Sequence, residues 1–217
     1  MTDQLKLYND ALLMCGERQL DSTNGLTEDT PSRYWLDSVW DNGAVNACLE
    51  EGQWRFAMRT IALDYTDTVT PTFGLNRAFI KPSDWVATSS ICSDEYFRNP
   101  LLGGELVDES GYWYAGIDVL YVRYVSNDEN YGTNYTAWPA WFADFVAAHL
   151  AFKIANKFTA DEEKRKDIKA DRKHFLMMAK NKNAEADPTQ FPPPGTWSSA
   201  RIGRSRKDRG NRGQLIG

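Results

Sequence analysis

Residues 135–158 read YTAWPAWFADFVAAHLAFKIANKF, and this stretch decides how the chain folds. Its large apolar residues recur at three- and four-residue spacing, which is typical of an amphipathic helix with a broad apolar face. Pro139 suits the first helical turn, where no backbone donor is lost. The alanines between the large residues leave room for another backbone to approach. We therefore expect a helix of roughly 30 Å in the centre of the core.

The same stretch does not have the pattern of a membrane span. Asp144, His149, Lys153 and Asn156 interrupt it, and alanine is more frequent in it than leucine. We therefore expect no membrane partner.

The composition is that of a soluble globular protein with an excess of aromatic residues. The 217 residues, 42% hydrophobic and 25% charged, suffice for one domain or for a domain with a sizeable insertion. Aromatic residues make up 13% of the chain, and eight of them are Trp. Because aromatic side chains anchor interfaces as well as fill cores, this excess favours a protein that assembles.

Charge is unevenly distributed along the chain. The formal net charge is −5, but residues 201–217 carry six basic side chains against Asp208 alone, a net +5 that leaves −10 on residues 1–200. An acidic body argues against broad phosphate binding by the body itself. The basic tail suits either an acidic protein partner or nucleic acid, and the salt dependence of binding distinguishes the two.

The cysteines do not form a recognisable motif. Cys15, Cys48 and Cys92 are far apart, odd in number and without a Cys-x-x-Cys pair, so we expect buried free thiols in a reducing compartment. The N-terminus shows no apolar signal-peptide core.

Two helices are expected before residue 52. The first spans residues 3–15, with Thr2 as its cap and Gly16 at its end. The second runs from Pro31, capped by Thr30, to about residue 51. Apolar residues surround most of this second helix, so it must be buried on most sides, against its own domain or against a neighbouring subunit.

A further helix is expected after the central one. Residues 159–162 form a Thr-x-x-Glu capping box, and the helix it opens continues to about residue 183. Glu162 and Lys166 can pair across one turn. We expect this helix to pack antiparallel on the central helix. Its predicted inward-facing residues are Ile168, Phe175, Met178 and Ala179.

The middle of the chain, residues 61–125, has a β pattern with many turns. Residues 54–59 alternate between apolar and other side chains just before it. Residues 108–111 read as a hairpin turn between residues 101–107 and 112–114. Residues 117–125 form the firmest strand, and both of its faces are apolar, so we expect it to be covered on both sides, by its own chain or by another.

These elements predict an α+β fold. It consists of a helical bundle with long antiparallel helices, formed by residues 1–60 and 134–186, and an inserted β-rich domain, residues 61–133. Residues 187–217 form an extended basic C-terminal arm, because their prolines forbid a regular helix. Isolated apolar residues in that arm favour a tail that orders on a partner over one that stays solvated.

No pattern of catalytic or ligand-binding residues emerges. The two histidines, His149 and His174, lie on successive predicted helices, but no metal-ligand spacing accompanies them. No phosphate-binding loop and no nucleophile motif is present. Paired carboxylates at residues 50–51 and 161–163 are read as helix-end charges. We therefore assign no catalytic, cofactor-binding or metal residues and do not expect an enzyme.

Several short motifs, in order, resemble phage tail tubular protein A, a head-to-tail adaptor family. The resemblance covers roughly residues 3–185. It includes a Pro-x-Asp landmark near the first β segment, an apolar strand ending in Arg-Tyr, and after that strand a Pro-aromatic helix and an Ala-rich stretch. The matching residues are LYNDAL at 7–12 with CGE at 15–17, LEEGQWRFA at 49–57, IKPSDW at 80–85, LYVRY at 120–124 and AAHLA at 147–151.

The resemblance implies a structural protein of the virion tail, located at the head–tail junction and assembled in the host cytoplasm. Members of the family form twelve-subunit rings beneath the portal protein, join it to the tail nozzle protein and can carry tail fibres on their outer face. The phage genome passes through the ring during DNA ejection, without specific binding. The family fold is a helical bundle interrupted by a β domain. C-terminal arms in such adaptors can reach the portal.

Two sets of residues follow as candidates, and two other functions compete. One alternative is a DNA-binding accessory protein that uses the basic tail, and the other is an enzyme whose site the sequence does not reveal. The candidate portal-docking residues are Trp197, Arg201, Ile202, Arg204, Arg206, Lys207, Arg209 and Arg212. The candidate subunit-packing residues are Trp35, Trp40, Trp138, Trp141 and Phe145.

Overall fold

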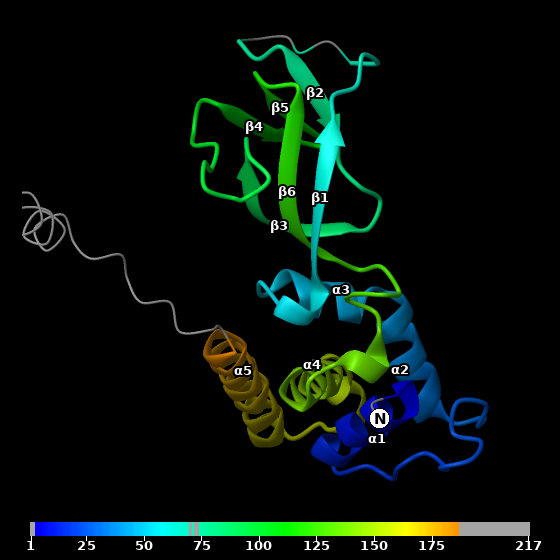
Figure 1. Ribbon diagram of the computed structural model, residues 1–217. Helices are drawn as coiled ribbons and strands as arrows, with labels where there is room; N and C mark the ends of the chain where they lie inside the picture. The colour runs from blue at the N-terminus through cyan, green and yellow to red at the C-terminus, as the bar shows by residue number, and fades with distance from the viewer. Residues whose placement is uncertain (1–2, 70, 72–73, 187–217) are drawn as a thin grey trace, which may run out of the picture. The chain divides into compact units, whose positions relative to one another are not determined.

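The computed structural model describes residues 3–69, 71 and 74–186, and its fold is α+β (Figure 1). In these residues five α-helices accompany six strands, which form two antiparallel three-stranded sheets. The chain as far as Ala184 forms one compact unit. Three helices precede the strands in the chain and two follow them.

Helix α1, Gln4–Cys15, is held at both ends by the residues that flank it. The Asp3 side chain accepts a hydrogen bond from Lys6 N, so Asp3 is the cap and the prediction of Thr2 is wrong. A carboxylate at this position satisfies a free amide of the first turn. Gly16 ends the helix as predicted, with a left-handed φ of 71° that glycine adopts without strain.

The long helix predicted over residues 31–51 is two helices. Thr30 caps α2, Pro31–Asp41, as predicted, but the helix ends at Asn42. Gly43 then has a φ of 83°, which a right-handed helix cannot contain, and α3 follows as Ala44–Glu50. The break changes the direction of the chain between the two apolar segments.

Helix α4, Ala140–Phe158, begins later than predicted. Residues 135–137 form a 3₁₀ turn, η2 (Tyr135–Ala137), and Trp138 is extended. This conformation follows from Pro139, whose ring disfavours helical geometry in the residue before it. Pro139 is therefore the N-cap and not a residue of the first turn.

Helix α5, Glu162–Glu185, is capped by Asp161, whose side chain accepts from Glu163 N at 2.9 Å. The predicted cap, Thr159, is instead the extended residue that ends α4. The Glu162–Lys166 pair forms at 3.4 Å, as predicted. Ile168 and Ala179 are buried, whereas Met178 is 40% exposed, so its predicted inward orientation is wrong.

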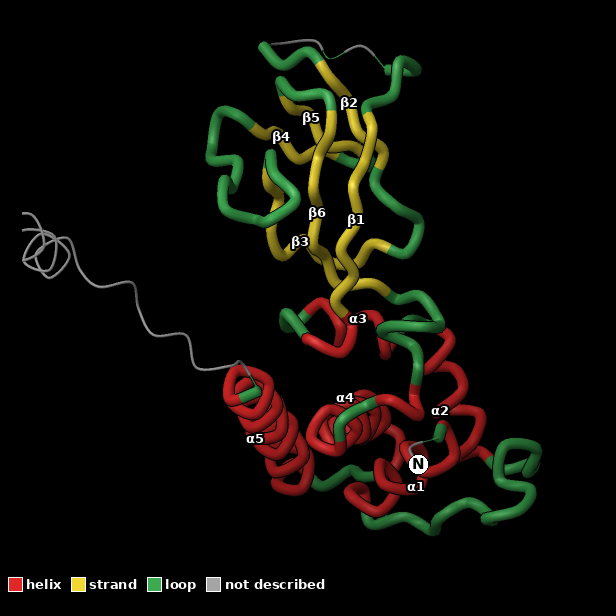
Figure 2. Tube along the Cα trace, viewed as in Figure 1, coloured by secondary structure: helices red, strands yellow, loops and turns green. Residues whose placement is uncertain are grey.

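The strands of the first sheet are ordered β1-β6-β3, and those of the second β2-β5-β4 (Figure 2). A 3₁₀ turn, η1 (Arg55–Ala57), replaces the predicted alternation before β1. Gly111 lies in the turn of the predicted hairpin, between β4 and β5. The strand bounds are Met58–Asp64 (β1), Arg77–Ile80 (β2), Trp85–Cys92 (β3), Leu106–Glu109 (β4), Tyr112–Ala115 (β5) and Val119–Ser126 (β6).

Strand β6 belongs to both hydrophobic clusters of the unit. Its Leu120, Val122 and Tyr124 pack with residues of the second sheet, whereas Val125 joins the cluster of the helices. Arg123 is exposed and Tyr121 is half-buried. The described chain therefore covers one face of β6 fully and leaves the other partly exposed over most of its length, so the predicted cover of that second face by another chain stays a prediction.

Helix α4 is the centre of the helical cluster, and its small residues are covered by the same chain. Ala147 and Ala151 have no exposed surface. The thiol of Cys15 on α1 lies 3.7 Å from the carbonyl oxygen of Ala151, as expected where two backbones approach closely. The alanines thus serve packing within the chain and are not surfaces for a neighbouring subunit.

We predict that Gly132→Ala lowers the free energy of unfolding by about 2–4 kcal/mol, because the backbone cannot yield around a new methyl group. A Cβ at Gly132 would overlap the carbonyl oxygen of Ser126 and lie 2.9 Å from Leu49 Cδ1. Gly116→Ala is the control, since a Cβ there meets nothing within 4 Å. Urea unfolding measures both, and equal midpoints would contradict the packing described around residue 132.

Candidate functional site

Trp54 lies where the helical cluster meets the first strand. Its indole Nε1 donates to the carbonyl oxygen of Cys48 at 2.9 Å, which satisfies its one polar atom in a fully buried position. Its ring packs against Trp141, Phe142 and Phe145 of α4, with centroids 5.1–6.1 Å apart. The end of α3 is thereby fixed to the beginning of α4.

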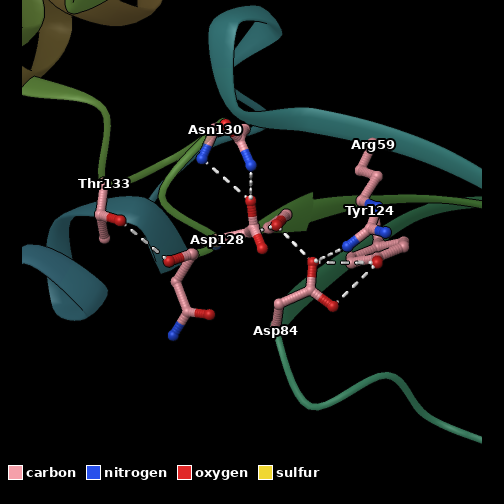
Figure 3. A network of polar contacts seen from close by, with 8 residues as sticks. Arg59, Asp84, Tyr124, Asp128, Asn130 and Thr133 are labelled. Atoms are coloured by element: carbon pink, nitrogen blue, oxygen red, sulfur yellow. Dashed lines mark hydrogen bonds and ion pairs between the residues drawn. The ribbon is translucent and has the colours of Figure 1, made fainter. Parts of the chain in front are cut away.

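Asp84, in the turn before β3, is the centre of a polar network (Figure 3). The Arg59 guanidinium donates to its carboxylate at 2.9 Å, and the Tyr124 hydroxyl lies 3.1 Å from both carboxylate oxygens. The Ser126 hydroxyl donates a third bond. Arg59 and Tyr124 are directly opposite each other in the register of β1 and β6. One carboxylate therefore links all three strands of the first sheet.

The network continues into the loop between β6 and α4. Ser126 Oγ accepts from Asp128 N at 3.0 Å, and Asp128 Oδ1 accepts from both the amide and the side chain of Asn130. The Thr133 hydroxyl donates to the carbonyl oxygen of Asn127 at 3.1 Å (Figure 3). These bonds fix the path along which the chain leaves the sheet.

Burial and hydrogen bonding act in opposite directions on the Asp84 carboxyl. Burial by itself raises the pKa of this group, but the bonds from Ser126, Arg59 and Tyr124 outweigh it and hold the pKa below its ordinary value. Burial, together with the neighbouring Asp84 charge, raises the pKa of the Tyr124 hydroxyl. The lowered pKa keeps this carboxylate ionised, so it can accept hydrogen bonds from the side chains of β1 and β6.

Lys81 fastens the same turn to the second sheet. Its ammonium pairs with Asp108 and lies 4.2 Å from the Trp85 ring centroid and 5.4 Å from that of Trp113. Trp113 Nε1 also donates to Asp108, at 3.1 Å. Segment 81–84 thus binds the second sheet through Lys81 and the first sheet through Asp84.

His149 is buried among the helices and held by Arg172 of α5. Arg172 Nε donates to His149 Nδ1 at 3.0 Å, and the same guanidinium pairs with Glu51. Burial, with the charge of Arg172, lowers the pKa of His149 to about 4. His174, the other histidine, is exposed on α5.

A pocket of about 260 Å³ lies beside His149, lined by α2, α3 and α4. His149 Nε2 has no hydrogen-bond partner among the described residues and almost no accessible surface. A ligand therefore cannot reach that nitrogen without movement of the surrounding side chains. The pocket carries no arrangement of acid, base and nucleophile.

No family model matches this chain, and a search of curated proteins also finds no match. The resemblance to the tail tubular protein family consequently rests on the motifs themselves. The structure adds where these motifs lie. Trp54, in residues 49–57, packs against α4, and Asp84, in residues 80–85, accepts a hydrogen bond from Tyr124, in residues 120–124.

The predicted subunit-packing residues separate into three groups. Phe145 has no exposed surface and Trp138 is 5% exposed, so both are core residues of this chain and cannot contact a neighbour. Trp141 and Trp40 are half-buried against the helical cluster. Trp35 is 42% exposed on α2, where the Lys157 ammonium lies 4.5 Å from its ring centroid. Only the last of these groups presents a substantial free aromatic surface.

Other predicted features have less to do with a site. All eight candidate portal-docking residues lie outside the described residues.

The three cysteines are free and buried, as predicted, and burial raises the pKa of the Cys15 thiol to about 11. In the part of the chain that is described, no group of three His, Cys, Asp or Glu side chains has the arrangement of a metal site. No helix there has the length and apolar character to cross a bilayer.

The sequence motifs include two members of the Asp84 network but do not indicate what these residues contact. Asp84 and Tyr124 stand in the Pro-x-Asp and Arg-Tyr landmarks. Arg59 and Ser126 were missed, because neither stands in a recognisable local pattern. Their place in the network follows only from the register of β1 against β6, which brings Arg59 opposite Tyr124.

We predict that Asp84→Asn lowers the free energy of unfolding at pH 7 by about 3 kcal/mol, because it leaves a guanidinium partly buried without its counter-charge. The matched control is Asp118→Asn, which breaks an Asp–Arg pair of the same length whose carboxylate is 74% exposed. There we expect a loss of about 0–1 kcal/mol. Urea unfolding measures both variants, and equal losses would show that the Asp84 network does not hold the sheet.

We predict that the protein loses about 2 kcal/mol of stability between pH 7.5 and pH 5 through His149. Its folded pKa of about 4 lies below that of the unfolded chain, so the unfolded state binds the proton first and stability falls as pH drops through about 6.5. His149→Gln should remove this part of the pH dependence, and the exposed control His174→Gln should retain it. Urea midpoints at the two pH values provide the measurement. A similar pH dependence in all three proteins would contradict the assignment.

Proposed function

We propose that this protein is a structural head-to-tail adaptor of a bacteriophage, a ring-forming subunit that joins the portal to the tail nozzle. In this proposal the subunit is a helical bundle interrupted by a β-rich segment and followed by a C-terminal arm. Its work is assembly, and no reaction is catalysed.

The observation that carries the proposal is the convergence of the family landmarks. The Pro-x-Asp turn and the Arg-Tyr strand are far apart in the sequence, yet Asp84 of the turn accepts a hydrogen bond from Tyr124 of the strand. Trp54, in a third landmark, packs against Phe142 at the beginning of α4. The contact between two of the landmarks supports the resemblance.

The distribution of the core gives further support. Helices from both ends of the chain share one hydrophobic cluster, while the two sheets enclose another. This is the arrangement that a helical bundle interrupted by β structure requires. The polar connection at Asp84 would keep the two parts in a fixed relation as copies assemble, since all its hydrogen-bonding groups are engaged.

Electrostatics suggests how DNA passes. Residues 1–200 carry a net charge of −10, so a channel wall formed by them would repel phosphates. DNA would then pass through without forming specific phosphate contacts. We place the phage portal at the basic arm, residues 187–217, where arginines would pair with acidic groups and Trp197 and Ile202 would supply apolar anchors.

We predict that the full chain, mixed with the portal protein of the same virus, forms a ring of multiple copies bound to it, detected by native mass spectrometry. Deleting residues 196–217 should weaken portal binding at least about tenfold, through loss of the arm contacts. The control replaces Lys166 and Lys169 of α5 by Gln, which removes basic charge elsewhere and should leave binding unchanged.

Two outcomes would count against this function. A chain that neither self-associates nor binds the portal would refute the adaptor. Tight DNA binding that falls steeply with salt and disappears on deletion of the arm would instead favour the DNA-binding accessory protein.

A further inference from the structure

Helix α2 presents an aromatic surface that the described residues leave uncovered. Tyr34 is 52% exposed and Trp35 is 42% exposed. They line a groove of about 460 Å³ with Asp29, Pro31 and Ser38. We call these five residues the α2 face. A groove of this size beside two large aromatic side chains has the composition of an interface core.

The two aromatic side chains of the α2 face are held in place before any partner arrives. The Tyr34 hydroxyl donates to Asp29 Oδ1 at 2.7 Å, and the Arg33 guanidinium lies 4.5 Å from the Tyr34 ring centroid. The Lys157 ammonium lies 4.5 Å from the Trp35 ring centroid. Side chains that are already ordered lose little entropy on binding, which makes them suitable anchors.

Helix α5 carries a second uncovered apolar surface. Met177 is 55% exposed and Met178 is 40% exposed, while Phe175, Leu176 and Ala179 pack toward the helical cluster. The exposed side chains of Lys173 and Lys180 stand one helical turn on either side of Met177. We call Lys173, Met177, Met178 and Lys180 the α5 face. Methionine adapts its shape to irregular surfaces and makes favourable contacts with aromatic rings.

The two faces differ in position and in charge. Helix α4 lies between α5 and α2 (Figure 2), and it contacts each of them. Residues 17–41, which include α2, carry six acidic and two basic side chains. Helix α5 carries eight basic and five acidic side chains. Opposite charge on separate faces favours contact between unlike faces of two copies and disfavours contact between like faces.

We propose that the α2 face of one copy binds the α5 face of the next, with Met177 and Met178 of one chain seated against Tyr34 and Trp35 of the other. A contact between two different faces leaves one of each free on the resulting dimer, so further copies add, and a ring forms where the rotation between successive copies closes. This inference rests on the proposed ring-forming function and names the surfaces that would build it.

The experiment uses two single variants of the full chain and their mixture. Trp35→Glu disables the α2 face, and Met177→Glu disables the α5 face by placing a charge at the centre of an apolar contact. Each variant alone should self-associate at least about thirtyfold more weakly than the native chain, because an anchor at the centre of the contact is lost. Mixed in equal amounts, they should form a dimer and nothing larger, since each copy retains one working face and the disabled faces repel.

Native mass spectrometry measures these states, with the proteins alone and on the portal, and circular dichroism checks that each variant folds. Leu13→Glu and Leu102→Glu are the controls, because these leucines are 63% and 67% exposed on other surfaces. They should assemble as the native chain does.

The failures are distinguishable. If both variants still form rings, or if the mixture forms no dimer, the pairing of α2 with α5 is wrong while the adaptor function stands. If the native chain remains monomeric up to millimolar concentration and also on the portal, the ring itself is refuted and both proposals fall.

Discussion

The carboxylate of Asp84 imposes the constraint on which the rest of the structure depends. A carboxylate withdrawn from water is stable only where donors satisfy its oxygens, and here the donors come from β1 and β6. The position of the turn into β3 therefore depends on the register in which β1 and β6 are paired. The same network fixes Ser126, and through it the loop that leads to α4.

The chain crosses between the helical cluster and the sheet cluster at two places. Strand β6 contributes Leu120 to the sheet cluster and Val125 to the helical cluster, so the same strand packs in both. Trp54 performs the equivalent role at the other crossing of the chain, where it links α3 to α4. Both crossings are buried or hydrogen-bonded, and the exposed large apolar side chains of the described helices include Tyr34 and Trp35 on α2 and Met177 on α5.

The tryptophans show that the periodicity of a sequence does not determine what covers the apolar face of a helix. A helix that is apolar on most sides indicates burial but does not say by what, so residues 31–51 were compatible with packing inside the chain or against a neighbour. The break at Gly43 gives the two parts of this segment different surroundings. Helix α3 buries Val45 and Leu49, whereas α2 leaves Trp35 exposed. In the central helix, Trp138 and Phe145 share the pattern of interface aromatics and yet belong to the core. Exposure depends on which elements lie alongside, and no local pattern encodes that.

The sequence by itself determined the α+β class, most of the elements and many of their ends. Caps, prolines and glycines act within a few residues, so Thr30 and Gly16 were placed correctly, and errors such as Thr2 for Asp3 were small. The tertiary structure alone decided the connection between the sheets and the helices and the surfaces left uncovered. Arg59, Asp84 and Tyr124 are 25 and 40 residues apart, and only strand register brings them within hydrogen-bonding distance. Register is a property of the paired strands together, because each strand read alone fits several alignments.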